Sequence, residues 1–205
     1  MQQTDSLRTR KQRQTRTTIV NAAYQLFGER GFDDVTVTEI AARAEVGRTT
    51  FFRYFGDKQE VLFADDAQVA EALTAQIQQT AVARRPIGDS LVTAIEIIRG
   101  ALTATRTGVP ETPDRFAIHT RLLQEHQDLQ ARHLLKQQRE AARLADILTE
   151  HGASPATAAL ATQLALACLN TAMNLAGGDR QTTSDTLEAA FNQLTGAIDR
   201  AADQR

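Results

Sequence analysis

The sequence predicts an all-α protein with about nine helices. Its 205 residues include only 11 glycines and 4 prolines, so long stretches contain no helix breaker. Those stretches are rich in Ala, Leu, Gln, Glu and Arg, which are good helix formers, whereas apolar residues alternating with a period of two are nearly absent. Hydrophobic residues make up 42% and charged residues 23% of the chain, a balance typical of a folded protein with a buried core.

Three of these helices are expected within the first 58 residues. The first runs through about Phe27 with one apolar face, and Gly31 ends it at a position suited to a left-handed backbone. Thr36 begins the second helix, because its hydroxyl and the carboxylate of Glu39 three residues later match the pattern of a capping box. A break at residues 45–47 keeps this helix short and separates it from a third short helix.

Two short helices joined by a tight turn are the layout of a DNA-reading unit. Phe51 and Phe55 mark the inner side of the third helix, and Val46 is placed to pack between the second and third helices. The overall charge of −2 conceals an asymmetry: residues 1–58 carry ten basic and seven acidic side chains, a net +3, and the rest carries −5. The basic end is therefore the candidate DNA-binding end.

Six further helices follow, and their limits are read from capping residues, prolines and glycines. They are expected from Asp57 to about Thr80, from Pro86–Ser90 to near Gly108, from Asp114 to His151 as a pair broken near residues 126–128, from Pro155 to Gly177, and from Thr183 or Ser184 onward.

The segment TVTEIAARAEVGRTTFFRYF at residues 36–55, closed by Lys58, resembles the DNA-binding signature of TetR-type transcriptional regulators. The resemblance covers about residues 13–63. The basic residues from position 8 to 16, with no acid among them, predict a flexible basic arm at residues 1–12. The resemblance implies a helix-turn-helix domain at residues 13–58 and a C-terminal helical ligand-binding and dimerisation domain at residues 59–205. It also implies a homodimeric regulator, usually a repressor, that a small molecule releases from a palindromic operator in double-stranded DNA.

The DNA-facing residues follow from this resemblance and from the needs of a recognition helix. Such a helix presents a polar outer face to base edges in the major groove. Arg48 suits guanine or phosphate, and Lys58 resembles the family's phosphate-contacting lysine. The basic residues at 8–16 either add phosphate or minor-groove contacts or form a merely solvated charge run. The expected DNA-binding residues are Arg13, Thr36, Thr38, Arg48, Thr49, Thr50, Phe52, Arg53, Tyr54 and Lys58.

Two residues depart from the family's pattern. Glu45 stands where the family usually has glycine, so the turn is either strained, at about 1–2 kcal/mol for a left-handed non-glycine residue, or shaped differently. Phe52 replaces the usual tyrosine and lacks its hydroxyl, which favours contact with a thymine methyl over a phosphate hydrogen bond.

The C-terminal domain is expected to bind a ligand and a second copy of the chain. It has no Trp or Tyr, which disfavours an aromatic cage and favours an aliphatic ligand. Arg115, His119 and Arg121 near a possible entrance favour a lipid-like or acyl-bearing anion. The residues expected to bind the ligand are Arg115, Phe116, His119, Leu122, Leu123, Leu166 and Asn170. The alternative to a ligand site is that these side chains fill the core and leave no cavity. The last two helices are expected to form the dimer interface, and the alternative is that they only cover their own domain. The expected interface residues are Leu164, Ala167, Leu187, Phe191, Leu194 and Ile198.

Other functions are disfavoured. No local pattern of catalytic residues or phosphate-binding glycines is present, so neither an enzyme nor a cofactor is expected. His119, His126 and His133 recur every seven residues, which on one helix places them about 10 Å apart along the axis, too far to share a metal. The lone Cys168 is expected to be buried, and polar residues interrupt the apolar stretch 156–176, so we expect a cytoplasmic protein outside the membrane. The alternatives are a helical protein-interaction scaffold and a small helical enzyme that binds no DNA.

Overall fold

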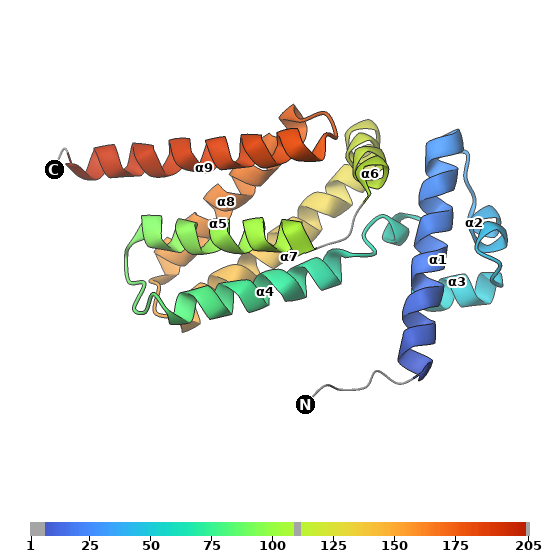
Figure 1. Cartoon of the computed structure of the whole chain (residues 1–205), viewed down its shortest axis with the longest axis horizontal. Coiled ribbons are helices and arrows are strands. Elements are labelled where there is room, and N and C mark those ends of the chain that lie inside the picture. Colours follow the sequence, from blue (N-terminus) through green and yellow to red (C-terminus); the bar gives the residue numbers. More distant parts are fainter. Residues whose placement is uncertain (1–6, 109–111, 204–205) are drawn as a thin grey trace. The chain divides into compact units, whose positions relative to one another are not determined.

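The structure is a computed structural model that describes residues 7–108 and 112–203 (Figure 1). Within these ranges the chain forms nine α-helices and a short 3₁₀ helix, which confirms the predicted all-α fold class. The elements are α1 (Leu7–Arg30), α2 (Val37–Arg43), α3 (Arg48–Tyr54), η1 (Gln59–Val61), α4 (Asp66–Val82), α5 (Leu91–Gly108), α6 (Pro113–Glu125), α7 (Gln127–Glu150), α8 (Pro155–Leu175) and α9 (Arg180–Asp203).

The first of two compact units spans Met1–Asp65 and contains α1, α2, α3 and η1. In this unit α2 packs against both α1 and α3, and α2 and α3 lie on the same side of α1 (Figure 1). Phe27 and Phe51 are fully buried, and the Phe51 ring centre lies 5.7 Å from that of Phe55. The predicted inner face of the third helix is therefore part of this unit's core.

Residues 7–12, expected in a flexible arm, instead form the first turns of α1; residues 1–6 of the expected arm lie outside the described residues. The hydroxyls of Thr15 and Thr18 each donate to a carbonyl oxygen one turn earlier, at 2.9 Å. A like-charged pair on a helix costs only about 0.2–0.5 kcal/mol. A basic run without Gly or Pro can therefore remain helical.

The prediction of one helix from Asp57 to about Thr80 is wrong at its start. Asp57 accepts a hydrogen bond from the Glu60 backbone N–H at 2.8 Å, but only η1 follows, and α4 begins at Asp66. The four consecutive residues 61–64 are all buried. Because an α-helix turns about 100° per residue, it cannot direct four successive side chains to one core. The first unit therefore ends at Asp65, later than the boundary expected after Lys58.

The second unit, Asp66–Arg205, contains helices α4 to α9. In this unit α8 packs against α5, α7 and α9, and α4 packs against α5 and α7. The fully buried large side chains include Ile77, Ile95, Leu148 and Phe191, which come from four different helices. One core thus joins these helices.

Capping residues set the limits of the last two helices. As predicted, Pro155 is the first residue of α8 and the Ser154 hydroxyl accepts a hydrogen bond from the Thr157 N–H at 3.4 Å. The last helix begins at Arg180 rather than at Thr183 or Ser184, because the Asp179 carboxylate accepts a hydrogen bond from the Thr182 N–H at 2.6 Å.

Among the described helices, α8 alone is long and apolar enough to cross a membrane, with a mean hydropathy of 1.3 over its most apolar window. The core helix of a soluble protein meets the same criteria. In this structure α8 packs against three other helices, and 33% of that apolar window is buried.

Candidate nucleic-acid interface and ligand cavity

The N-terminus of α2 is held by the predicted capping box. The Glu39 backbone N–H donates to Thr36 Oγ1 at 3.2 Å, and the Thr36 backbone N–H donates to Glu39 Oε2 at 2.8 Å. The Thr36 hydroxyl also donates to Glu39 Oε2 at 2.7 Å, and Arg30 Nη1 donates to Oε1 at 2.6 Å. The hydrogen bonds from Thr36 and then from Arg30 lower the pKa of Glu39 to about 2. The exposed Thr36 side chain thus already serves the helix cap.

The turn between α2 and α3 uses a left-handed residue that is not glycine. Glu45 has φ 55°, its N–H donates to the Ala42 carbonyl at 3.1 Å, and the Val46 N–H donates to the Ala41 carbonyl at 2.9 Å. These two bonds form a Schellman motif, in which the left-handed position is usually glycine. Of the two possibilities raised by the sequence, the structure has the strained turn.

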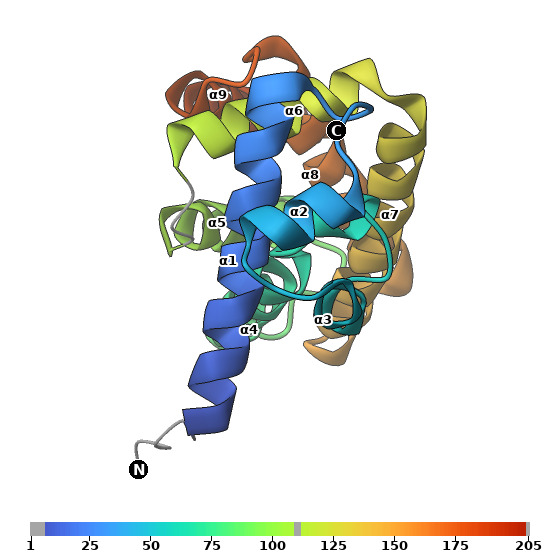
Figure 2. The ribbon, with the colours of Figure 1, turned by 90° about the vertical axis from the view of Figure 1, so that its right-hand side faces the viewer.

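Helix α3 has a buried side and an outer side. Phe51 is fully buried and its ring makes an edge contact with that of Phe52, which is 47% exposed. Figure 2 shows α3 nearly end-on and α2 nearly side-on, so the two helices cross steeply. Arg48, Thr49 and Arg53 are exposed on the outer side. The helix therefore presents a mainly polar ridge with one apolar side chain.

Lys58 precedes η1 and is partly buried. Its Nζ donates to the Phe32 carbonyl oxygen at 2.7 Å and lies 4.1 Å from the centre of the Phe32 ring. Burial lowers the pKa of Lys58, and the nearby carboxylates of Asp33 and Asp34 oppose that effect. The ammonium group is thus tied to the loop that follows α1.

Arg16, within the basic run, contacts three groups of the first unit. Its guanidinium lies 5.2 Å from the centre of the Phe55 ring, donates to the Ala64 carbonyl and lies 3.8 Å from the Asp65 carboxylate. It therefore connects α1 to the end of the first unit. Arg8, Arg10, Lys11 and Arg13 are the basic residues of the run that lie exposed or nearly so on α1.

All ten expected DNA-binding residues reach the surface of the first unit. Seven are exposed: Arg13, Thr36, Thr38, Arg48, Thr49, Phe52 and Arg53. Three are partly buried: Thr50, Tyr54 and Lys58. Eight of the ten lie on α2, α3 or the cap of α2.

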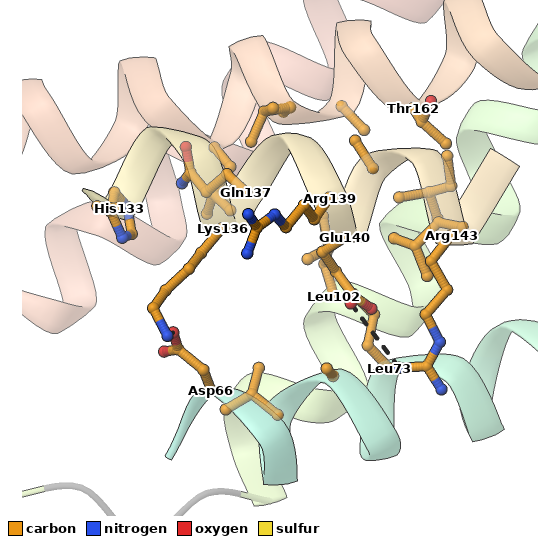
Figure 3. Close-up of a pocket in the computed structure, with 18 of the residues that line it drawn as sticks. Asp66, Leu73, Leu102, His133, Lys136, Gln137, Arg139, Glu140, Arg143 and Thr162 are labelled. Atoms are coloured by element: carbon orange, nitrogen blue, oxygen red, sulfur yellow. Dashed lines mark ion pairs between the residues drawn. The ribbon is translucent and has the colours of Figure 1, made fainter. Parts of the chain in front are cut away.

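The second unit contains a cavity of about 510 Å³ lined by α4, α5, α7 and α8 (Figure 3). Its apolar lining residues are Ala67, Val69, Ala70, Leu73, Ile98, Leu102, Ala141, Leu144, Ala165, Leu166 and Leu169. Its charged lining residues are Asp66, Lys136, Arg139, Glu140 and Arg143. Lys136 lies 3.8 Å from the Asp66 carboxylate, and Arg143 lies 3.8 Å from that of Glu140.

Few of the expected ligand residues line this cavity. Leu166 does, and Leu123 and Asn170 line a second cavity of about 160 Å³ between α6, α7 and α8. The others, Arg115, Phe116, His119 and Leu122, line neither, and Leu122 is fully buried in the core. The sequence interpretation relied on α6, whereas α7 supplies most polar groups of the larger cavity. The missed signal is the spacing of His133, Gln137 and Glu140, which places polar side chains on the inward face of α7.

The histidine argument also needs correction. The chain bends at His126, so His119 lies on α6 and His133 on α7, and their ring centres are 6.2 Å apart. Distance along one helix therefore does not keep these two side chains apart. Burial, followed by the neighbouring His133 and Arg115, lowers the pKa of His119 to about 4. Within the described residues, no group of three metal-ligating side chains gathers.

Two of the expected dimer residues lie in the core of their own unit. Leu187 is 2% exposed and Phe191 is fully buried. Leu164, Leu194 and Ile198 are partly buried against the same core, whereas Ala167 is exposed. The outward faces carry mostly small or polar residues: Ala156, Ala159, Leu160, Gln163, Ala167, Thr171 and Leu175 on α8, and Ala189, Asn192, Gln193 and Ala197 on α9.

Comparison with known proteins identifies a match in the first unit. The sequence profile of "Bacterial regulatory proteins, tetR family" matches residues 19–64, which run from the middle of α1 to just beyond η1. The matched segment therefore includes the two short helices, their turn and the buried segment that follows η1.

The similarity extends into the second unit. The HTH-type transcriptional regulator TcmR of Streptomyces glaucescens is 34% identical over 146 residues, which make up 69% of this chain and 62% of that protein. The match thus spans less than two thirds of that regulator. Two solved structures share the fold. A transcriptional regulator from Aquifex aeolicus VF5 superposes with a TM-score of 0.56 and 16% sequence identity, and the match covers 88% of this chain and 97% of that one. Thermus thermophilus FadR in complex with lauroyl-CoA superposes with a TM-score of 0.52 and 24% identity, and the match covers 87% of this chain and 92% of that one.

Proposed function

Because this chain belongs to the TetR family of bacterial regulatory proteins, we propose that it is a sequence-specific DNA-binding transcriptional regulator of the bacterial cytoplasm, and not an enzyme. The observation that carries the proposal is the matched segment 19–64 folded as two short helices with a polar ridge on α3. The basic excess of residues 1–58 supports the same role, because neutralised phosphates supply much of the affinity for DNA.

The residues proposed to read DNA are those expected from the sequence. Arg48 at the start of α3 is exposed and bonds to a guanine or a phosphate, while Phe52 contacts a thymine methyl. Thr49, Thr50 and Tyr54 bond to phosphates or base edges, and Thr38 approaches the other side of the groove. The Thr36 hydroxyl, engaged by Glu39, contributes mainly by holding α2 in place.

The protein acts as a homodimer on a palindromic operator. Two identical readers related by a two-fold axis recognise two half-sites one helical turn apart or more. The exposed small residues of α8 and α9 allow close approach of the same helices from a second copy, with Leu160 and Leu175 as apolar anchors. Leu187 and Phe191 are buried in the core of their own unit, where they hold α9 in place beneath this surface.

The cavity of the second unit binds a small effector with an aliphatic or acyl-bearing body. Its mainly apolar lining supports such a body, and Arg139 extends its guanidinium toward the open space in Figure 3. Lauroyl-CoA, the ligand in the solved structure of Thermus thermophilus FadR, carries an acyl chain. Binding favours a dimer geometry that no longer matches the operator, so DNA and effector oppose each other and the regulator acts as a repressor.

Selection of genomic fragments by the full-length chain tests this function. We expect enrichment of one palindromic sequence, and we expect Arg48→Ala to lower affinity for it by about tenfold or more, because one good base contact is worth about 1–3 kcal/mol. Arg84→Ala, which removes an exposed arginine from the second unit, is the matched control. Failure to enrich any sequence, or equal effects of the two variants, would exclude the proposed reading mode.

A further inference from the structure

Two oxygen atoms in the wall of the larger cavity lack hydrogen-bond partners within the described part of the chain. They are Oε1 of Gln137 and Oε1 of Glu140, each with less than 1 Å² of accessible surface. Both residues belong to α7 and line the cavity of about 510 Å³. They are three residues apart, so their side chains lie on the same face of the helix, about 5–6 Å apart at Cβ.

The remaining polar atoms of these side chains are accounted for. Gln137 Nε2 donates to Asn170 Oδ1 at 3.0 Å, which sets the orientation of the amide and directs its oxygen elsewhere. Glu140 Oε2 lies 3.8 Å from Arg143 Nη1, which leaves Oε1 as the unpaired carboxylate oxygen. Each side chain therefore has one acceptor without a donor, and because that oxygen has less than 1 Å² of accessible surface, a ligand reaches it once the side chain rotates toward the cavity.

Buried acceptors without a donor are rare, because losing water without gaining a hydrogen bond is unfavourable. Burial raises the pKa of Glu140, and the nearby Arg143 opposes that rise. The surrounding wall includes the apolar side chains of Leu73, Leu102 and Leu144, and no donor among the described residues bonds to either oxygen. A bound molecule that donates a hydrogen bond to each oxygen would remove the unfavourable free energy of burying these acceptors without partners.

We infer that Gln137 and Glu140 form a recognition edge for two hydroxyl groups on an effector whose body is apolar. The apolar remainder of the cavity accommodates that body. Hydroxyls fit better than an ammonium group, because three basic residues (Lys136, Arg139 and Arg143) but only two acidic ones line the cavity. This inference rests on the proposed function, since it takes the cavity as the effector site.

Titration calorimetry on the full-length protein tests the inference with a matched set of probes. The probes are dodecane-1,2-diol, its dimethyl ether, dodecylamine and dodecanoate, which share one alkyl chain and differ in donors and charge. We expect the diol to bind about tenfold or more tightly than the dimethyl ether, because the ether donates no hydrogen bond. We also expect it to bind more tightly than either charged probe.

Three variants assign the effect to the recognition edge. Glu140→Leu should abolish the preference for the diol over its ether, whereas Glu140→Gln keeps an acceptor and should retain most of it. Glu150→Leu removes an exposed carboxylate at the end of the same helix and should change nothing. Thermal unfolding of Glu140→Leu should occur at or above the wild-type temperature, because the variant removes a buried unpaired oxygen.

Several outcomes would overturn the inference. Equal binding of the diol and its ether would contradict it, as would tighter binding of dodecanoate or dodecylamine. Binding of none of the probes, or a diol preference that survives Glu140→Leu, would contradict it as well. Operator binding by the same preparation is measured in parallel. Intact operator binding with a failed probe test refutes the inference alone, whereas absent operator binding refutes the proposed function.

Discussion

Lys58 donates a hydrogen bond from its Nζ to the carbonyl oxygen of Phe32 at 2.7 Å, and its ammonium group lies 4.1 Å from the centre of the Phe32 ring. This contact connects the segment before η1 to the loop that follows α1. A lysine proposed to contact a DNA phosphate is therefore held in position without DNA. Holding it beforehand reduces the side-chain entropy lost when DNA binds.

Replacing Lys58 with methionine should affect both stability and DNA binding. We expect Lys58→Met to lower the free energy of unfolding by about 1–2 kcal/mol, because it removes a charge-assisted hydrogen bond. If the ammonium also contacts a phosphate, the slope of log affinity against log salt concentration should become shallower by about 0.9. Urea unfolding and fluorescence anisotropy at several salt concentrations measure the two effects. An unchanged salt slope would remove Lys58 from the DNA interface.

The strained turn predicts a stabilising substitution. Glu45→Gly should raise the free energy of unfolding by about 0.5–1 kcal/mol, because relief of the left-handed strain exceeds the added freedom of the unfolded chain. Ala42→Gly, within α2, is the control and should lower stability by about 1 kcal/mol. Urea unfolding distinguishes the two; a destabilising Glu45→Gly would mean that the Glu45 side chain makes a compensating interaction.

The pH dependence of stability should reflect His119. Its pKa is about 4 in the folded protein against an ordinary 6.5, because of burial beside His133 and Arg115. The unfolded chain thus binds more protons between these values, so stability falls as the pH decreases from 6.5 to 4, by at most about 1.4 kcal/mol per pH unit.

His119→Gln should reduce this acid-dependent loss, and His126→Gln, at the bend between α6 and α7, is the control. Urea unfolding at a series of pH values between 4 and 7 measures the effect. A wild-type profile that His119→Gln leaves unchanged would show that His119 titrates normally.

The proposed dimer surface can be tested at an exposed alanine. Ala167→Arg on α8 should shift the protein from dimer to monomer, because it places an unpaired charge in a closely packed interface. Ala142→Arg, at an exposed position of α7, should leave the dimer intact. Analytical ultracentrifugation provides the measurement. A dimeric Ala167→Arg protein with normal operator affinity would place the interface elsewhere.

Local interactions explain how much of the fold could be predicted. The Thr36–Glu39 capping box, Pro155 at the start of α8 and the turn at Glu45 all depend on residues within five positions of one another. The amino-acid order alone therefore determined the helices, most of their limits and the polar outer face of α3, because short-range hydrogen bonds and helical periodicity specify them.

Only the tertiary structure decided which partners these helices meet. An apolar stripe shows that a helix face is buried, but not whether a partner copy or its own unit covers it, and Leu187 and Phe191 proved to be core residues. Likewise, the bend at His126 brings His119 to His133, and the packing of α7 places Gln137 and Glu140 at the cavity. These relationships join residues far apart in the chain, so they depend on how whole helices pack rather than on local sequence.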